Sequence, residues 1–160
     1  MLFVRLVSCA ALLTFTFAFE SRAQSIEVLL KKGWAAHGFQ QFEEAIRISS
    51  ECVDQFGGQA RRDQSRLSKS PPRHALPVGR ISKDSPEAKE ALENGILNDA
   101  AACLFILGDS LERTSRCPKA KSTYEDLAKL TLARVWDPRG WFWVPSDAAL
   151  DGLERLKGRC

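Results

Sequence analysis

The stretch LFILGDSLERTSRCPKAKSTY, residues 104–124, predicts two helices that pack against each other across a short turn. Its glycine, Gly108, lets two antiparallel helices approach closely at their crossing, and the small Ala120 packs opposite it for the same reason. Pro118 suits the first turn of the second helix, where its missing N–H costs no hydrogen bond. Large residues on the same helical faces fill the layers above and below the crossing: Leu104, Leu107, Leu111 and Tyr124.

An earlier pair of helices is predicted in the same register. Gly33 precedes Ala45 by 12 residues, and Gly108 precedes Ala120 by the same 12 residues. The earlier helices therefore have their small residues where a close crossing needs them. The large residues that also match in this earlier pair are Leu29 and Phe42.

Together these spacings resemble the tetratricopeptide repeat (TPR), a helical hairpin in which x2-L-G-x2-Y is followed by A-x3-F. The resemblance implies an all-α fold over residues 24–160, with two TPR-like antiparallel helix pairs and a C-terminal capping helix. The two glycines lie 75 residues apart rather than the roughly 34 of tandem copies, so about 41 residues are inserted between the repeats. An unrelated helical bundle is the alternative, because three positions of the earlier pair depart from the pattern: Lys32, Ala36 and Ser49.

Helical periodicity and caps predict the other elements. A first helix is expected over 26–38 after a Ser25 cap, and a second over 39–56, ended by Gly57-Gly58. Further helices are expected over 86–93 (cap Ser85), 99–114 (cap Asn98 or Asp99), 118–135 and 147–158 (cap Ser146). No segment has a convincing strand pattern.

Residues 57–85 separate the two predicted repeats and are rich in Arg, Ser and Pro. Between Gly57 and Lys83 there are seven cations and one acid. Such a composition buries too little apolar surface to order itself, so a flexible, disordered basic insertion is expected. A solvated loop and a surface for an anionic partner are both compatible with this composition.

The N-terminus has the pattern of a signal peptide over residues 1–23, with an early cation, an apolar run and small residues before Ala23. The apolar run of roughly 14 residues is shorter than the ~20 that span a bilayer, so cleavage is favoured over a retained membrane anchor. Cys9 precedes most of the run, which disfavours lipidation there. A periplasmic or secreted protein without a membrane span after cleavage is expected. ARVWDPRGWFWVPSDAA, residues 133–149, resembles the C-terminal part of bacterial exported TPR-like proteins of unassigned activity.

Four cysteines remain after residue 23, and an even number in an exported protein favours disulfides. The TPR-like register implies which ends of the helices meet. It brings Cys52, late in the second helix, to Cys103, early in the next long helix. It also brings Cys117, at the start of its helix, to Cys160, after the last one. The predicted pairs are Cys52–Cys103 and Cys117–Cys160, and free buried thiols are the alternative.

Composition and motifs give no support to an enzyme. A net charge of +3 on 160 residues fits one globular domain and does not favour nucleic-acid binding. G-x-S-x-G, H-E-x-x-H and a Gly-rich phosphate loop do not occur. The two histidines, His37 and His74, are too few for an ordinary zinc site beside scattered cysteines. We therefore predict no catalytic residue, no metal and no cofactor.

The TPR resemblance implies a concave groove lined mainly by the first helix of each pair. Such a groove binds a segment of a partner, and an unidentified envelope protein is the partner expected here. The Lys/Asn set with which some TPR proteins bind a C-terminal carboxylate is not present. The groove residues implied by the register are Leu30, Trp34, His37, Phe105, Asp109, Glu112 and Arg113.

WDPRGWFWVP, residues 136–145, holds three of the four tryptophans. Asp137-Pro138-Arg139-Gly140 has the pattern of a β-turn, so Trp136 is expected to end one helix and an extended Trp141-Phe142-Trp143 to lead to the last. These four aromatic residues either cap the end of the helical array or form a platform for cell-wall glycan. Because neighbours in an extended run face opposite ways, either Phe142 or the pair Trp141 and Trp143 is buried.

Overall fold

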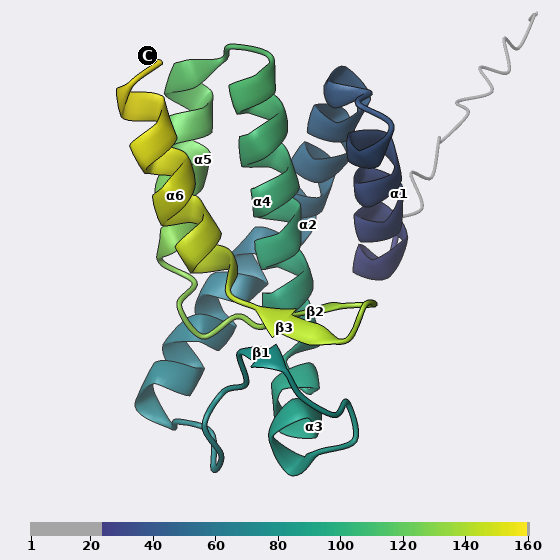
Figure 1. Cartoon of the computed structure of the whole chain (residues 1–160), viewed down its shortest axis with the longest axis vertical. Coiled ribbons are helices and arrows are strands. Elements are labelled where there is room, and N and C mark those ends of the chain that lie inside the picture. The colour runs from purple at the N-terminus through teal and green to yellow at the C-terminus, as the bar shows by residue number, and fades with distance from the viewer. Residues whose placement is uncertain (1–23, 160) are drawn as a thin grey trace, which may run out of the picture.

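The structure, a computed structural model, describes residues 24–159 (Figure 1). The signal peptide predicted over 1–23 and the cysteine at position 160 lie outside the described residues. The described chain is mostly helical, as predicted, and adds a small sheet. Its elements are α1 (Ile26–Gly38), α2 (Phe42–Lys69), β1 (Gly79–Arg80), α3 (Pro86–Leu92), α4 (Gly95–Arg113), α5 (Cys117–Ala128), β2 (Val135–Asp137), β3 (Trp141–Trp143) and α6 (Pro145–Lys157).

Helix α4 forms the centre of the fold. Fourteen of its 19 residues are buried, which is the pattern of a helix covered on nearly every side. It packs against α1, α2, α5 and α6. In Figure 1, α1 and α6 lie on either side of α4, α2 and α5 lie further back, and the sheet lies across the lower end of α4. The chain's apolar surface is therefore buried mainly around this one helix.

The turns that follow α1 and α4 have the same backbone geometry at positions 75 residues apart. Gln40 and Ser115 are both left-handed, each with φ 58°. The next amide in each turn donates to a carbonyl of the preceding helix, which closes the helix end as in a Schellman motif. These bonds are Gln41 to Ala36 at 2.9 Å and Arg116 to Leu111 at 2.8 Å. The first helix of each of the pairs α1–α2 and α4–α5 therefore ends in the same kind of turn.

Glycine makes the close contact within each hairpin, as predicted, but the opposing residue is one turn beyond the expected alanine. A Cβ on Gly33 would lie 3.2 Å from the Ser49 hydroxyl, and one on Gly108 would lie 2.6 Å from the Tyr124 ring. The other side of the same ring faces Gly152 of α6, also at 2.6 Å from a would-be Cβ. The fully buried Tyr124 ring is therefore held between α4 and α6 because both helices have glycine there.

Replacing glycine by alanine is expected to have opposite effects on stability at Gly108 and at Gly58. Gly108→Ala is expected to destabilise the fold by about 1–3 kcal/mol, because the new methyl group overlaps a ring that cannot move. Gly58→Ala, in α2, meets only the end of the Arg62 side chain and is expected to stabilise by about 0.5–1 kcal/mol through helix propensity. Urea unfolding measures both. A neutral or stabilising Gly108→Ala would show that the ring is not held there.

Helix α2 does not end at Gly57-Gly58, so that prediction is wrong. It continues to Lys69 through the first part of the predicted insertion. Ala60 and Leu67 of this extension are buried, and Gln64 accepts a hydrogen bond from the Leu132 amide at 3.0 Å. Glycine costs a helix only about 1 kcal/mol per residue, and this packing exceeds that cost. Residues 57–69 are therefore ordered by a few apolar and amide contacts, although their composition is that of a loop.

The rest of the predicted insertion contributes a strand, which the sequence did not reveal. The sheet order is β1-β3-β2, with both pairs antiparallel. The turn predicted over Asp137–Gly140 is confirmed: the Gly140 amide donates to the Asp137 carbonyl at 2.9 Å, and Gly140 has φ 102°. This turn joins two strands, however, whereas a helix was expected before it. The expectation that Trp136 ends a helix is wrong, because α5 stops at Ala128 and Trp136 belongs to β2.

One of the predicted helix caps is confirmed and two are wrong. The short helix α3 is confirmed, and the Ser85 hydroxyl accepts a hydrogen bond from the Ala88 amide at 3.2 Å. Asn98 does not cap α4, which begins at Gly95. Its buried amide side chain instead donates to the Ala91 carbonyl at 2.8 Å and accepts from the Arg134 amide at 2.8 Å, joining α3, α4 and the entry to β2. Ser146 lies inside α6 rather than capping it.

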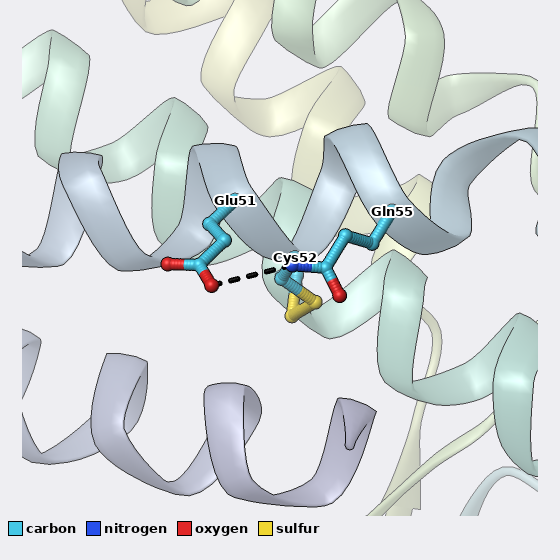
Figure 2. Close-up of a disulfide and its surroundings, with 4 residues drawn as sticks. Glu51, Cys52 and Gln55 are labelled. Carbon is cyan, nitrogen blue, oxygen red and sulfur yellow. Dashed lines mark hydrogen bonds between the residues drawn. A yellow bond between two sulfur atoms is a disulfide. The ribbon is translucent and has the colours of Figure 1, made fainter. Parts of the chain in front are cut away.

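The predicted disulfide Cys52–Cys103 is confirmed, and it joins α2 to α4 (Figure 2). Both cysteines are almost fully buried. Glu51 and Gln55, on either side of Cys52 along α2, hydrogen-bond to each other at 3.2 Å. Cys117 is also disulfide-bonded. Because Cys160 lies outside the described residues, the pair Cys117–Cys160 stays a prediction.

Candidate functional site

A groove of about 640 Å³ lies between α1, the lower end of α4, the β2–β3 hairpin and the start of α6. Aromatic side chains from three of these elements line it, so we call it the aromatic groove. Trp34 comes from α1, Phe105 from α4, and Trp141 and Trp143 from β3. Other lining residues are Lys31, Val135, Trp136, Asp137, Pro138, Arg139 and Ala148.

A row of aromatic rings in edge-to-face or tilted contact runs from this groove along α1. The Trp143 ring centre lies 5.2 Å from that of Phe105, which lies 5.9 Å from that of Trp34. His37 continues the row at 5.9 Å from Trp34, and Phe42 lies 6.0 Å beyond it. These five residues form the aromatic row. All five are partly exposed rather than buried.

The sheet decides which aromatic residues reach the groove. Directly paired residues of antiparallel strands share a face, and Trp143 pairs with Val135 while Phe142 pairs with Trp136. Trp143 therefore faces α4, and Phe142 faces the opposite way. Phe142 is 1% exposed and packs with Ala88 and Ala91 of α3 in a second small core. Of the two burial patterns that the sequence allowed, the structure has Phe142 buried and both tryptophans partly exposed.

The groove continues upward along α4 into a polar cavity of about 410 Å³, lined by Phe105, Asp109, Glu112, Arg113 and Arg155 among others. The Asp109 carboxylate accepts hydrogen bonds from His37 at 2.7 Å and from Arg113 at 2.6 Å. Burial alone would raise the pKa of this carboxyl, but the two hydrogen bonds hold it below its usual value. Asp109 is thus an ionised anchor that ties α1 to α4.

Glu112, one turn further along α4, has partners from two other helices. Its carboxylate accepts hydrogen bonds from the Arg155 guanidinium at 2.9 Å, the Tyr124 hydroxyl at 2.9 Å and Arg159 at 3.2 Å. The Arg155 bond is the main reason that the pKa of Glu112 is lowered, and burial together with Glu112 raises the pKa of Tyr124. The Glu112 side chain is only 4% exposed, so its charge is balanced inside the protein.

The structure therefore brings the predicted groove residues together on one face, with two kinds of role. Leu30, Trp34 and Phe105 offer partly exposed apolar surface. Asp109 and Glu112 are buried and paired, so they hold helices together rather than face a partner as free acids. His37 joins the aromatic row while bonded to Asp109. The polar cavity also has exposed charged side chains, those of Arg113, Asp151, Arg155 and Arg159. Sequence reasoning predicted Arg113 but missed Arg155, because only the fold brings α6 beside α4.

Comparison of the chain with known protein families, with curated proteins and with solved structures finds no match. Within residues 24–159, no three His, Cys, Asp or Glu side chains gather closely enough to hold a metal ion. Over the same residues, no single helix is both long and apolar enough to cross a membrane. Only α3 and α4 taken together meet that test, as a pair bent by 72°.

Proposed function

We propose that this protein is a non-catalytic protein-interaction module whose aromatic groove binds a segment of a partner protein. The observation that carries the proposal is the aromatic row, in which Trp34, Phe105 and Trp143 contact one another in sequence yet stay partly exposed. Trp34 and Phe105 pack against the main core and also line the groove. Aromatic side chains left in a groove supply the large, rigid contact area typical of interaction hot spots.

The two helical hairpins support a TPR-like array as the frame of this groove. They share a turn geometry and a glycine contact at the same spacing. In this proposal α1 and α4 are the first helices of two repeats and α6 is the capping helix, so the three helices that line the groove are those that line a TPR groove. Between the repeats, this chain adds the extension of α2, β1 and α3.

We propose that the protein acts outside the cytoplasm, in the periplasm or as a secreted protein. The Cys52–Cys103 disulfide, buried between two helices, suits an oxidising compartment. The signal-peptide pattern of residues 1–23 points the same way. The partner would then be a protein of the cell envelope, and the module a scaffold for its assembly.

A glycan-binding accessory domain is the second candidate. Trp141 and Trp143 come from one strand, line the aromatic groove and stay partly exposed, as a platform for sugar rings requires. The Arg139 guanidinium lies 4.4 Å from the centre of the Trp141 ring and occupies part of its face. The protein-binding proposal is favoured because the row extends beyond these tryptophans onto α1.

Alanine substitutions within the aromatic row test the proposal. Trp34→Ala and Phe105→Ala are each expected to cost about 1–2 kcal/mol of stability, since both rings are partly exposed, and to leave the fold intact. Both should abolish capture of the partner, because they remove its anchoring surface. The measurement is mild crosslinking of the tagged protein in the cells that produce it, followed by mass spectrometry of bound proteins and glycan fragments.

Phe39→Ala is the matched control, because Phe39 is 77% exposed at the turn after α1 and lies outside the groove. It should leave capture unchanged. The proposal fails if the Phe105→Ala protein, shown to be folded by its circular dichroism, captures the same partner as the wild type. Recovery of glycan fragments without a protein, lost in a Trp143→Ala variant, would support the second candidate.

A further inference from the structure

A second cavity, of about 440 Å³, opens beside the aromatic groove at the lower end of α1 and α4. It shares Lys31, Trp34 and three residues of the hairpin with that groove, so the two are continuous. Half of its lining residues are apolar or aromatic, and two carboxyl groups lie among them, those of Glu27 on α1 and Asp99 on α4. We call it the Asp99 pocket. The apolar side chains that line it are Leu30, Trp34, Leu92, Val135, Trp136 and Pro138.

Asp99 differs from the other partly buried acids of the groove region. Asp109 and Glu112 each accept hydrogen bonds from at least two side chains. Asp99 has no hydrogen-bond or ion-pair partner anywhere in residues 24–159. Desolvation, with a smaller contribution from the negative charge of Glu27, raises the pKa of Asp99 to about 6. The Asp99 side chain is still partly exposed, so its carboxylate is partly desolvated, has no partner in the described chain and remains open to a ligand.

The two cations that line the Asp99 pocket do not compensate this carboxylate. Arg134 turns its guanidinium to the backbone, donating to the Thr131 carbonyl at 2.9 Å and the Ala133 carbonyl at 2.7 Å. Lys31 is exposed and forms no ion pair with Asp99. The charged neighbour that acts on Asp99 is Glu27, which adds negative charge. The pocket therefore presents the carboxylates of Asp99 and Glu27, neither of which forms an ion pair with Lys31 or Arg134, beside apolar and aromatic side chains.

We propose that the Asp99 pocket binds a cationic side chain, lysine or arginine, of the same partner segment that occupies the aromatic groove. The ammonium or guanidinium group would pair with Asp99, and its methylene stem would lie against Leu30 and Trp34. A long cationic side chain matches this arrangement, because it has an apolar stem and a charged end. Trp34 lies in both cavities, so one segment can place an apolar anchor in the groove and a neighbouring cation in the pocket. This inference rests on the proposed function.

The pocket can be tested with small probes before the partner is known. The probe is N-acetyl-arginine N-methylamide, and its uncharged match is the norleucine derivative, followed by NMR of the Trp34 indole and the Asp99 carboxyl carbon. The arginine probe should give saturable shifts at both positions. It should also lower the titration midpoint of Asp99, because a bound cation stabilises the ionised form. The norleucine probe should leave the midpoint unchanged.

Asp99→Asn keeps the shape of the side chain and removes its charge. It should weaken binding of the arginine probe by about tenfold or more, the usual effect of losing a charge-assisted contact. Asp54→Asn, at an exposed acid of α2, is the matched control and should leave binding unchanged. Equal affinity of the arginine probe for the wild-type and Asp99→Asn proteins, or equal affinity of the two probes for the wild type, would overturn the inference.

Capture of the partner separates failure of this inference from failure of the proposed function. If Trp34→Ala and Phe105→Ala lose the partner while Asp99→Asn retains it fully, the groove has its proposed role and the pocket does not bind a partner cation. If all three variants retain the partner, the proposed function itself fails, whatever the probes show. Loss in all three, with Asp54→Asn unaffected, is the result that we expect.

Discussion

Removing the Cys52–Cys103 disulfide is expected to lower the free energy of unfolding by about 4 kcal/mol. The two cysteines are 51 residues apart in the sequence, and the bond limits the unfolded chain across that whole loop. It also links α2 to the central helix α4 across the basic segment that composition alone predicts to be disordered. The variant to compare with the wild type is Cys52→Ala combined with Cys103→Ala, in urea unfolding without reductant.

Titration of thiols in denaturant provides the control for this result. The wild-type protein should show no reactive thiol from this pair, because both sulfurs are bonded to each other. A loss of only about 1 kcal/mol in the double variant is what the missing sulfur atoms alone would produce. That outcome, together with reactive thiols in the wild type, would contradict the disulfide and favour the free buried thiols that the sequence left open.

Phe142→Ala is expected to destabilise the protein by about 3–5 kcal/mol, the usual cost of removing a buried phenylalanine. The ring is 1% exposed, and it fills the small core between the sheet and α3. Its loss would leave Ala88 and Ala91 facing a cavity and would loosen β1. Urea unfolding measures the change, and exposure of α3 to hydrogen exchange should increase with it.

Trp141→Ala, at the neighbouring position, is the matched comparison. Trp141 lies on the other face of β3, partly exposed against Arg139, so its removal should cost no more than about 1 kcal/mol. Similar losses of stability for Phe142→Ala and Trp141→Ala would contradict the conclusion that Phe142 is a structural residue and Trp141 faces the groove. Phe142 and the two tryptophans thus lie on opposite faces of one strand.

Much of the helical frame was predictable from local patterns, because helices repeat their signals over many residues. The spacing of Gly33 and Gly108 from their alanines predicted two similar hairpins, and the turns at Gln40 and Ser115 have the same backbone geometry. The sheet was not predictable, because its strands have two or three residues each, too few to show alternation. Its pairing joins β1 to β3, more than 60 positions away in the chain.

Composition was misleading over residues 57–69. The segment reads as a charged loop, yet Leu67 and Gln64 connect it to the rest of the fold and continue α2 to Lys69. The contacts of these two residues order the segment, and the average composition of the segment does not reveal them. The short helix α3 was predictable for the opposite reason, because Ser85 and Pro86 mark its start directly.

The register predicted some of the residues that line the two cavities, but not which of their charged side chains are paired. Register alone placed Trp34, Phe105 and Asp109 on one face, and the structure has them there. Which acid is paired depends on partners from distant segments: Arg155 comes to Glu112 only through the packing of α6, and no cation within residues 24–159 forms an ion pair with Asp99. Sequence spacing does not contain that information.

Site-specific photo-crosslinking tests the central claim, that the aromatic groove binds a partner segment. A photoreactive p-benzoylphenylalanine would replace Lys31, which lines the groove and is exposed, and in a second protein Gln55, on the exposed side of α2. Illumination in the producing cells should give one discrete protein adduct from position 31, lost when Phe105→Ala is added, and none from position 55. No adduct from position 31, or equal adducts from both positions, would contradict the account.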